Sequence, residues 1–248
     1  LLYPFINKTA LFRGQWGFRK GALSREAFDD LVIETVEPIF ERLKTWCKEE
    51  NVLRPKVVYG WWPCNSEGND VVIFDSEDHE KEIARYSFPR QSKRQRRCLS
   101  DFFKPKESGE KDVIGMSCVT VGSEVSKRTR DLFDKDEYTE YLYLHGIGVE
   151  CAEALAEYWH KKMRTELGIA GEDKPTAKEL FAQGYRGSRY SFGYPACPEM
   201  EKQEILFKLL EPDRIGCTLT ESWEIVPEQS TSAIIVHHPQ AKYFSAKI

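Results

Sequence analysis

Apolar residues in the region from residue 24 to about residue 51 recur every three or four positions, which is the spacing of an amphipathic helix. These positions are Phe28, Leu31, Val32, Val36, Ile39, Leu43, Trp46 and Cys47. Ser24 stands where the N-cap of such a helix belongs. Pro38 lies inside the pattern and lacks a backbone donor, so we expect the helix to kink or break near it.

The same periodicity returns further along the chain and predicts three more helices. They cover residues 138–167, 177–183 and 199–210. Thr176 and Glu179 have the spacing of a capping box, which favours a helix start at this point.

Segments rich in β-branched and aromatic residues follow the first helix, with turn-forming residues between them. Residues 56–62, 71–75 and 83–88 indicate an antiparallel meander, and further strands are expected at 113–121, 218–226, 232–237 and 241–246. Strands therefore gather at both ends of the sequence instead of alternating with helices. This order predicts an α+β single domain with a mixed or antiparallel sheet flanked by long helices.

The composition narrows the class of protein. A chain of 248 residues with 41% apolar content can bury one substantial core, so we expect a single domain over residues 1–248. The net charge of -4 gives no overall attraction to nucleic acid or to an anionic membrane. The longest apolar runs are far shorter than the roughly 20 residues that span a bilayer. A start at Leu1 without methionine indicates a fragment.

Cysteine and histidine usage bears on location and on metal binding. The seven cysteines are scattered without CxxC spacing, which favours a reducing compartment and a cytoplasmic location. Of five histidines only His237 and His238 are adjacent, so the clustered ligands of zinc are absent and we expect no structural metal.

The most basic segment, residues 91–97, has two interpretations. It carries Lys93, Arg94, Arg96 and Arg97. A solvated loop is the simpler interpretation, and a patch that docks a partner is the alternative.

The segment with the clearest chemical content is residues 189–198, RYSFGYPACP. Its two prolines and its glycine oppose a regular element and hold the chain extended. Because the prolines have no N–H, the amides of Tyr194, Ala196 and Cys197 are the donors left to recognise a ligand. A purely structural turn is an equally good interpretation of these residues alone.

This segment resembles RxxxGYPACP, the S-adenosylmethionine signature of the C-terminal reactivation domain of cobalamin-dependent methionine synthases. The resemblance runs in order through nearly the whole chain, including residues 58–65 (VYGWWPCN), 98–102 (CLSDF), 219–222 (LTES) and 238–244 (HPQAKYF). It implies that residues 1–248 are an S-adenosylmethionine-binding reactivation domain, a fragment of a larger multidomain methyltransferase that uses methyltetrahydrofolate and homocysteine. The chain alone is not expected to make methionine.

The resemblance also implies a role for several side chains. Arg189 matches the arginine that binds the ligand carboxylate, for which a planar guanidinium suits bidentate pairing. Glu153 matches the glutamate near the methionyl ammonium, and it shares a helical stripe with Glu157 and His160. Glu157 is the neighbouring carboxylate most easily mistaken for it.

Tyr243 and Phe244 match an aromatic pair at the ligand, where a ring can stack on adenine or face the sulfonium. In a strand the two side chains point to opposite faces, so we expect Tyr243 to contact ligand and Phe244 to pack in the core or contribute backbone. Asn7 departs from the family pattern, because some relatives carry aspartate there. It can still hydrogen-bond a ribose hydroxyl or an amine, although a charge-assisted bond is about twice as strong.

In the family, S-adenosylmethionine methylates cob(I)alamin during reductive reactivation. The cobalt is the nucleophile, so we expect the protein to supply geometry and a dry site but no catalytic side chain. The chain lacks the Asp-x-His-x-x-Gly motif, which implies that cobalamin is held by another domain of the enzyme. A flavodoxin-like or other flavoprotein reductase is the expected electron donor, and the cluster of Arg13, Arg19 and Lys20 could dock it.

Two other functions stay open. One is a non-catalytic S-adenosylmethionine-sensing or interaction module of the same fold. The other is a methyltransferase for small molecules or nucleic acid, which is weaker because no GxGxxG motif opens a dinucleotide-type unit.

Overall fold

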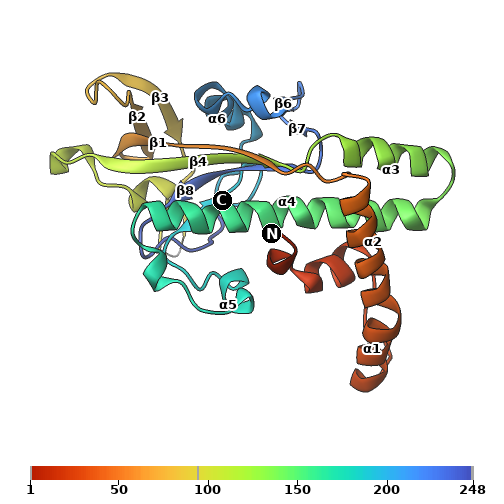
Figure 1. Ribbon diagram of the computed structural model, residues 1–248. Coiled ribbons are helices and arrows are strands. Elements are labelled where there is room, and N and C mark those ends of the chain that lie inside the picture. The colour runs from red at the N-terminus through yellow and green to blue at the C-terminus, as the bar shows by residue number, and fades with distance from the viewer. Residues whose placement is uncertain (1, 94, 247–248) are drawn as a thin grey trace.

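The computed structural model describes residues 2–93 and 95–246 of the chain (Figure 1). Arg94, one of the four cations of the basic segment, lies outside these residues. No helix within the described part of the chain is long and apolar enough to cross a membrane.

The first predicted helix is one continuous helical stretch over residues 25–49. It consists of α1 (Arg25–Leu31), a π-helical segment (Val32–Val36) and α2 (Glu37–Glu49). The Ser24 hydroxyl accepts a hydrogen bond from the Ala27 amide at 3.0 Å, which confirms the N-cap. Pro38 occupies the first turn of α2, a place where its missing N–H is tolerated. We expected a kink or break near Pro38, and the structure instead has a π-helical segment just before the proline, in a helix that continues.

A six-stranded sheet forms the centre of the fold, in the order β3-β2-β1-β4-β8-β5. Its strands are β1 (Lys56–Glu67), β2 (Asp70–Phe74), β3 (Glu82–Ser87), β4 (Asp112–Thr120), β5 (Ser188–Tyr190) and β8 (Ser230–Val236). Every neighbouring pair of strands is antiparallel. The expected meander and the α+β class are confirmed.

Helices cover both faces of this sheet. The long helix α4 (Tyr138–Glu166) crosses one face, and α6 (Gln203–Leu210), which follows a 3-10 turn (Met200–Lys202), packs on the other (Figure 1). Side chains of β8 alternate between the two layers, as a strand requires. Ile234 joins the core beneath α6, whereas Ile235 packs against Met163 of α4.

Two further helices complete the fold. The short helix α5 (Ala177–Phe181) begins with the predicted capping box, in which the Thr176 side chain and the Glu179 carboxylate each bind the other residue's amide. It ends at Phe181, earlier than expected, because Gln183 has a left-handed φ of 58°. The helix α3 (Glu124–Asp134) was not expected, since few of its residues are apolar.

Two predicted strands are wrong. Residues 218–226 form a hairpin of two short strands, β6 (Thr218–Leu219) and β7 (Ile225–Val226). The Thr220 hydroxyl accepts the amides of Ser222 and Glu224 and closes the turn between them. Residues 241–246 contain no strand but run as an irregular segment whose Ala246 amide donates to the Pro195 carbonyl at 2.8 Å.

A glycine of α4 brings the N-terminal segment against that helix. A Cβ atom at Gly146 would lie only 2.8 Å from Gln15 Cβ and 2.9 Å from the Trp16 indole, so no larger residue fits. The Trp16 Nε1–H donates to the Tyr143 carbonyl at 3.0 Å. The preceding π-helical turn (Ala10–Gln15) is thereby fixed beside α4.

Candidate functional site

A cavity of about 390 Å³ lies beside α4, within the range of small-molecule sites. It is lined by the N-terminal segment, α4, α5, β5 with the loop after it, β8 and the irregular C-terminal segment. The N-terminal segment and α5 lie on the same side of α4 (Figure 1). Six of the seven predicted site residues line this cavity: Asn7, Glu153, Arg189, Tyr194, Ala196 and Tyr243.

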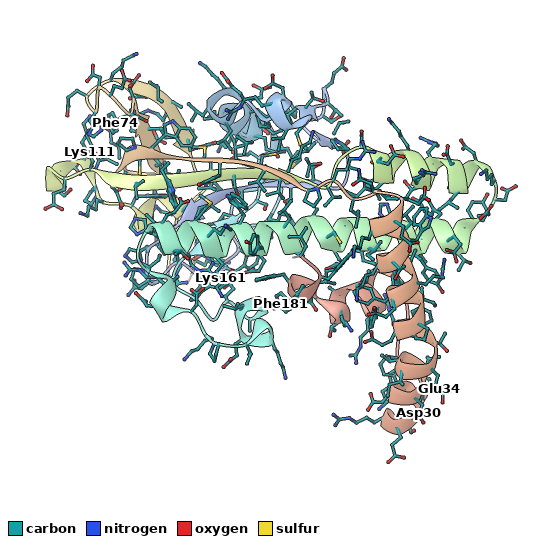
Figure 2. The ribbon with its side chains drawn as sticks, viewed as in Figure 1. Asp30, Glu34, Phe74, Lys111, Lys161 and Phe181 are labelled. Atoms are coloured by element: carbon teal, nitrogen blue, oxygen red, sulfur yellow. The ribbon has the colours of Figure 1, made fainter. Side chains whose placement is uncertain are left out.

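One face of α4 supplies most of the charge in the cavity. Glu150, Glu153, Ala154 and Glu157 line it, at the i, i+3, i+4 and i+7 spacing of a single helical face. Phe181 of α5 also lines the cavity and lies below α4 in Figure 2. The helix thus presents three carboxylates to a space that is otherwise lined by uncharged side chains and Arg189.

Arg189 is held by a carboxylate of the protein itself. Its Nη1 donates to Glu157 Oε2 at 2.9 Å, and the two side chains are 20% and 7% exposed. Burial opposes the charge of the guanidinium, but Glu157, Tyr185 and Glu153 together outweigh burial and raise the pKa of Arg189. Glu157 Oε1 has no hydrogen-bond partner within the described part of the chain. Glu157 is thus the partner of Arg189, a role that sequence reasoning missed.

Beyond this ion pair, the buried face of α4 carries a polar cluster. The Arg164 guanidinium pairs with both oxygens of Asp173, at 2.8 and 2.7 Å, and lies over the Tyr185 ring. The His160 ring meets Tyr185 edge-on. Burial, with the charges of Arg189 and Arg164, holds the pKa of His160 well below its usual range, so its ring is neutral.

The loop after β5 is a tight turn. Gly193, with a φ of 80°, donates to the Cys197 carbonyl at 2.9 Å, and the Cys197 amide donates to the Tyr194 carbonyl at 2.8 Å. The Cys197 amide is therefore used inside the turn, against our expectation that it would be available to a ligand. Among described residues, the Ala196 amide has no backbone partner, whereas Tyr194 forms an isolated antiparallel bridge with Cys197. The expectation of an irregular segment was also wrong at its start, because Arg189 pairs with Ile235 in the sheet.

The two aromatic residues near the C-terminus lie in different environments. Tyr243 is 51% exposed and lines the cavity, whereas Phe244 is 7% exposed and lies outside it. The Phe244 ring packs edge-on against Phe102 and Tyr190 in the core. The Phe244 ring is therefore part of the core, as expected, and a contact between Phe244 and the ligand through its backbone stays a prediction. The opposed rings were expected from a strand, but here an irregular backbone produces them.

Asn7 lies at the edge of the cavity and also caps the N-terminal helical turn. Its Oδ1 accepts the Ala10 amide at 3.2 Å. Because this bond uses the side-chain oxygen, the Nδ2 donor is the group that Asn7 has left for a ligand. An aspartate could cap the turn and still offer a second, charged acceptor.

Glu150 is a further cavity residue that sequence reasoning missed. Its side chain is buried, with the residue 6% exposed. Burial, reinforced by the Glu153 carboxylate, raises the pKa of Glu150 to about 7, although a hydrogen bond with Gln15 opposes the shift. The helical spacing of Glu150 and Glu153 was a signal in the sequence that could have found it.

A second, larger cavity of about 1260 Å³ adjoins the first and extends along α3. The two share Glu153, Ser191, Tyr194, Thr231 and Ser232. A molecule in the smaller cavity would therefore be reached from the larger one.

Comparisons with known proteins agree with this architecture. The family model described as "Vitamin B12 dependent methionine synthase, activation domain" matches residues 2–248. The methionine synthases of Mycobacterium tuberculosis (strain ATCC 25618 / H37Rv) and Mycobacterium leprae (strain TN) share 42% and 38% sequence identity with this chain. Each match covers 97% of the chain. The chain spans about a fifth of the length of these relatives, 21% in each case.

A solved structure is similar over the whole fold. "Crystal Structure of the MetH Reactivation Domain bound to AdoHcy" superposes with a TM-score of 0.89 at 30% sequence identity. The match covers 99% of this chain and 78% of the solved chain.

Proposed function

This chain belongs to the activation domains of vitamin B12-dependent methionine synthases, and on that premise we propose that it binds S-adenosylmethionine and positions the methyl group for transfer to cob(I)alamin. The observation that carries the proposal is Arg189, which faces a cavity of suitable size while Glu157 holds one of its nitrogens. The solved relative bound to AdoHcy, the demethylated form of the same molecule, supports this choice of ligand.

The cavity offers a partner to each part of the ligand. Arg189 uses Nη1 for Glu157, so its other donors can pair with the methionyl carboxylate. Glu153 complements the ammonium, and Tyr243 offers a flat ring to the adenine. The Ala196 amide can donate to the base edge, the Tyr194 side chain lines the cavity beside it, and the Asn7 side-chain amide can donate to a ribose oxygen.

S-adenosylmethionine supplies an electrophilic methyl group on a sulfonium, and reduced cobalt supplies the electron pair. The protein needs no acid or base for such a step, only alignment and exclusion of water. The ion pair between Arg189 and Glu157 holds the amino-acid end, while Tyr243 holds the other end. The larger cavity is the proposed side from which cobalamin would approach the bound ligand.

The cobalamin is held by another domain, because the described cavity residues include no histidine that could serve as its ligand. The length of the relatives supports such further domains. Methionine synthesis from homocysteine and methyltetrahydrofolate belongs in this proposal to the complete enzyme. The seven free cysteines, all buried, suit a cytoplasmic location.

A flavoprotein reductase is the proposed source of electrons. Arg13, Arg19 and Lys20 are exposed, and the Arg13 guanidinium lies over the Phe28 ring. Reversal of Arg19 and Lys20 to glutamate should slow reductive reactivation and weaken its salt dependence, since exposed charges act mainly on the encounter rate. Unchanged rates at low salt would count against docking at this patch.

Methyl transfer to added cob(I)alamin tests the proposal against a non-catalytic binding module. The purified chain is mixed with S-adenosylmethionine and excess reduced cobalamin, and methylcobalamin is followed by its absorbance. We expect faster formation than in a reaction without protein, and a loss of that acceleration in Arg189→Lys. Tight binding without any acceleration would favour the sensing or interaction module.

A further inference from the structure

The charges that line the smaller cavity do not balance. Glu150, Glu153 and Glu157 face one cation, Arg189, and Arg189 is paired with Glu157. In the part of the chain that the structure describes, neither Glu150 nor Glu153 takes part in an ion pair with a lysine, arginine or histidine. The Glu153 charge acts on Arg189 without an ion-pair contact, so among the described cavity residues Glu150 is the carboxylate that has no cation near it, and the cavity has a net negative charge.

The burial of Glu150 and Glu157 indicates that a ligand completes them, whereas Glu153 is exposed. Glu150 is 6% exposed, and Glu157, 7% exposed in its side chain, has one oxygen without any partner in the described structure. Buried carboxylates without a cation are costly, so such groups are normally found at sites where a charge is bound. A cationic ligand would relieve this cost, and a neutral one would not.

The spacing of the two unpaired carboxylates matches the proposed ligand. Glu150 and Glu153 lie three residues apart on the same face of α4, a rise of about 4.5 Å along the helix. The ammonium and the sulfonium of S-adenosylmethionine are joined by a short carbon chain of similar reach. Glu153 is the proposed partner of the ammonium, which leaves Glu150 for the sulfonium.

We propose that Glu150 is a specificity-determining residue whose carboxylate favours the sulfonium of S-adenosylmethionine over the neutral thioether of S-adenosylhomocysteine. The inference rests on the proposed function and deepens it. Methyl transfer removes the positive charge, so the same carboxylate weakens the hold on the product. Selection of substrate and release of product thus follow from one side chain.

Two neighbours set the state of this carboxylate. Gln15, fixed beside α4 by the close approach at Gly146, forms a hydrogen bond with Glu150. Burial and the Glu153 charge raise the pKa of Glu150 to about 7. At pH 8 the carboxylate is therefore largely ionised, and this is the condition under which its charge should be tested.

The test compares two ligands that differ by one methyl group and one charge. Calorimetry at pH 8 gives Kd for S-adenosylmethionine and for S-adenosylhomocysteine with the wild-type chain and with Glu150→Gln. Glu140→Gln is the matched control, because Glu140 also lies on α4 but pairs with Arg42 away from the cavity. We expect the ratio of the two Kd values to shift about tenfold toward S-adenosylhomocysteine in Glu150→Gln only.

The conservative variant Glu150→Asp keeps the charge and should keep most of the preference. If Glu150→Gln does not fold, Glu150→Met provides an uncharged side chain of similar length for the same comparison. An unchanged ratio in a wild-type-like fold, even with both affinities lowered, overturns the inference while the proposed function stands. A wild-type chain that binds neither ligand overturns both.

Discussion

The Arg189 guanidinium and the Glu157 carboxylate meet at 2.9 Å inside the cavity and join strand β5 to helix α4. Arginine has more donors than one carboxylate oxygen can use, so this contact leaves part of the guanidinium available. The pair therefore gives Arg189 both a structural role and a ligand-binding role. Arg189 can tie the loop after β5 to the fold and still bind the ligand carboxylate.

Arg189→Lys separates these two roles. Lysine keeps the charge that Glu157 requires but loses the planar fork, so the affinity for S-adenosylmethionine should fall by about 1.5–3 kcal/mol, roughly ten- to a hundredfold. The Tm of the ligand-free protein should change little. Calorimetry and thermal unfolding give both values, and Arg186→Lys, at an arginine outside the cavity that pairs with Glu172, is the control. Wild-type affinity in Arg189→Lys would contradict the carboxylate contact.

Tyr243 and Phe244 provide a pair of adjacent aromatic residues with opposite expected effects. Tyr243→Ala should weaken S-adenosylmethionine binding by about 1–3 kcal/mol through lost stacking and leave stability nearly unchanged. Phe244→Ala should lower the free energy of unfolding by about 3–5 kcal/mol, because a buried ring is removed, with affinity of the folded fraction near wild type. Calorimetry measures the affinities and urea unfolding measures the stabilities. Lost stability in Tyr243→Ala together with lost affinity in Phe244→Ala would contradict the placement of Tyr243 in the cavity and of Phe244 in the core.

Glu150 should give the stability of the protein a characteristic pH dependence. Burial, with the nearby Glu153 charge, raises its pKa in the folded state to about 7 from the ordinary glutamate value of 4.5. The folded state therefore binds the proton more tightly, and this contribution is lost as the pH rises through about 7. Relative to wild type, Glu150→Gln should gain stability between pH 4.5 and 7 and then level off. Urea unfolding at pH 5, 6, 7 and 8 measures this, and a pH-independent difference would contradict the buried carboxylate.

Local signals explain which parts of the fold could be predicted. Ser24 and Thr176 mark helix starts because a cap depends on neighbouring residues alone. The meander of β1 to β3 likewise follows from alternation and turn residues. By contrast, α3 has few apolar residues, and β5 is three residues long and is defined only by its pairing with β8. Long-range contacts decide such elements.

The candidate site likewise has features that the sequence could predict and features that depend on long-range contacts. The residues that the family resemblance supplied converge on one cavity, except for Phe244, whose ring turns into the core. Glu157 could not be paired with Arg189 from sequence, because the two are brought together by the packing of α4 on the sheet. The Cys197 amide was misjudged for a similar reason, since the turn that uses it forms only when Gly193 adopts its left-handed φ.

Calorimetric titration of S-adenosylmethionine into the purified chain, without metal or cobalamin, measures whether the chain binds this ligand by itself. We expect saturable heat for one site and thermal stabilisation that grows with ligand concentration, reaching about 2.7 kcal/mol at a hundredfold excess over Kd. Circular dichroism of the same sample establishes that the protein is folded. The absence of both heat and stabilisation at millimolar ligand in a folded sample would contradict the claim.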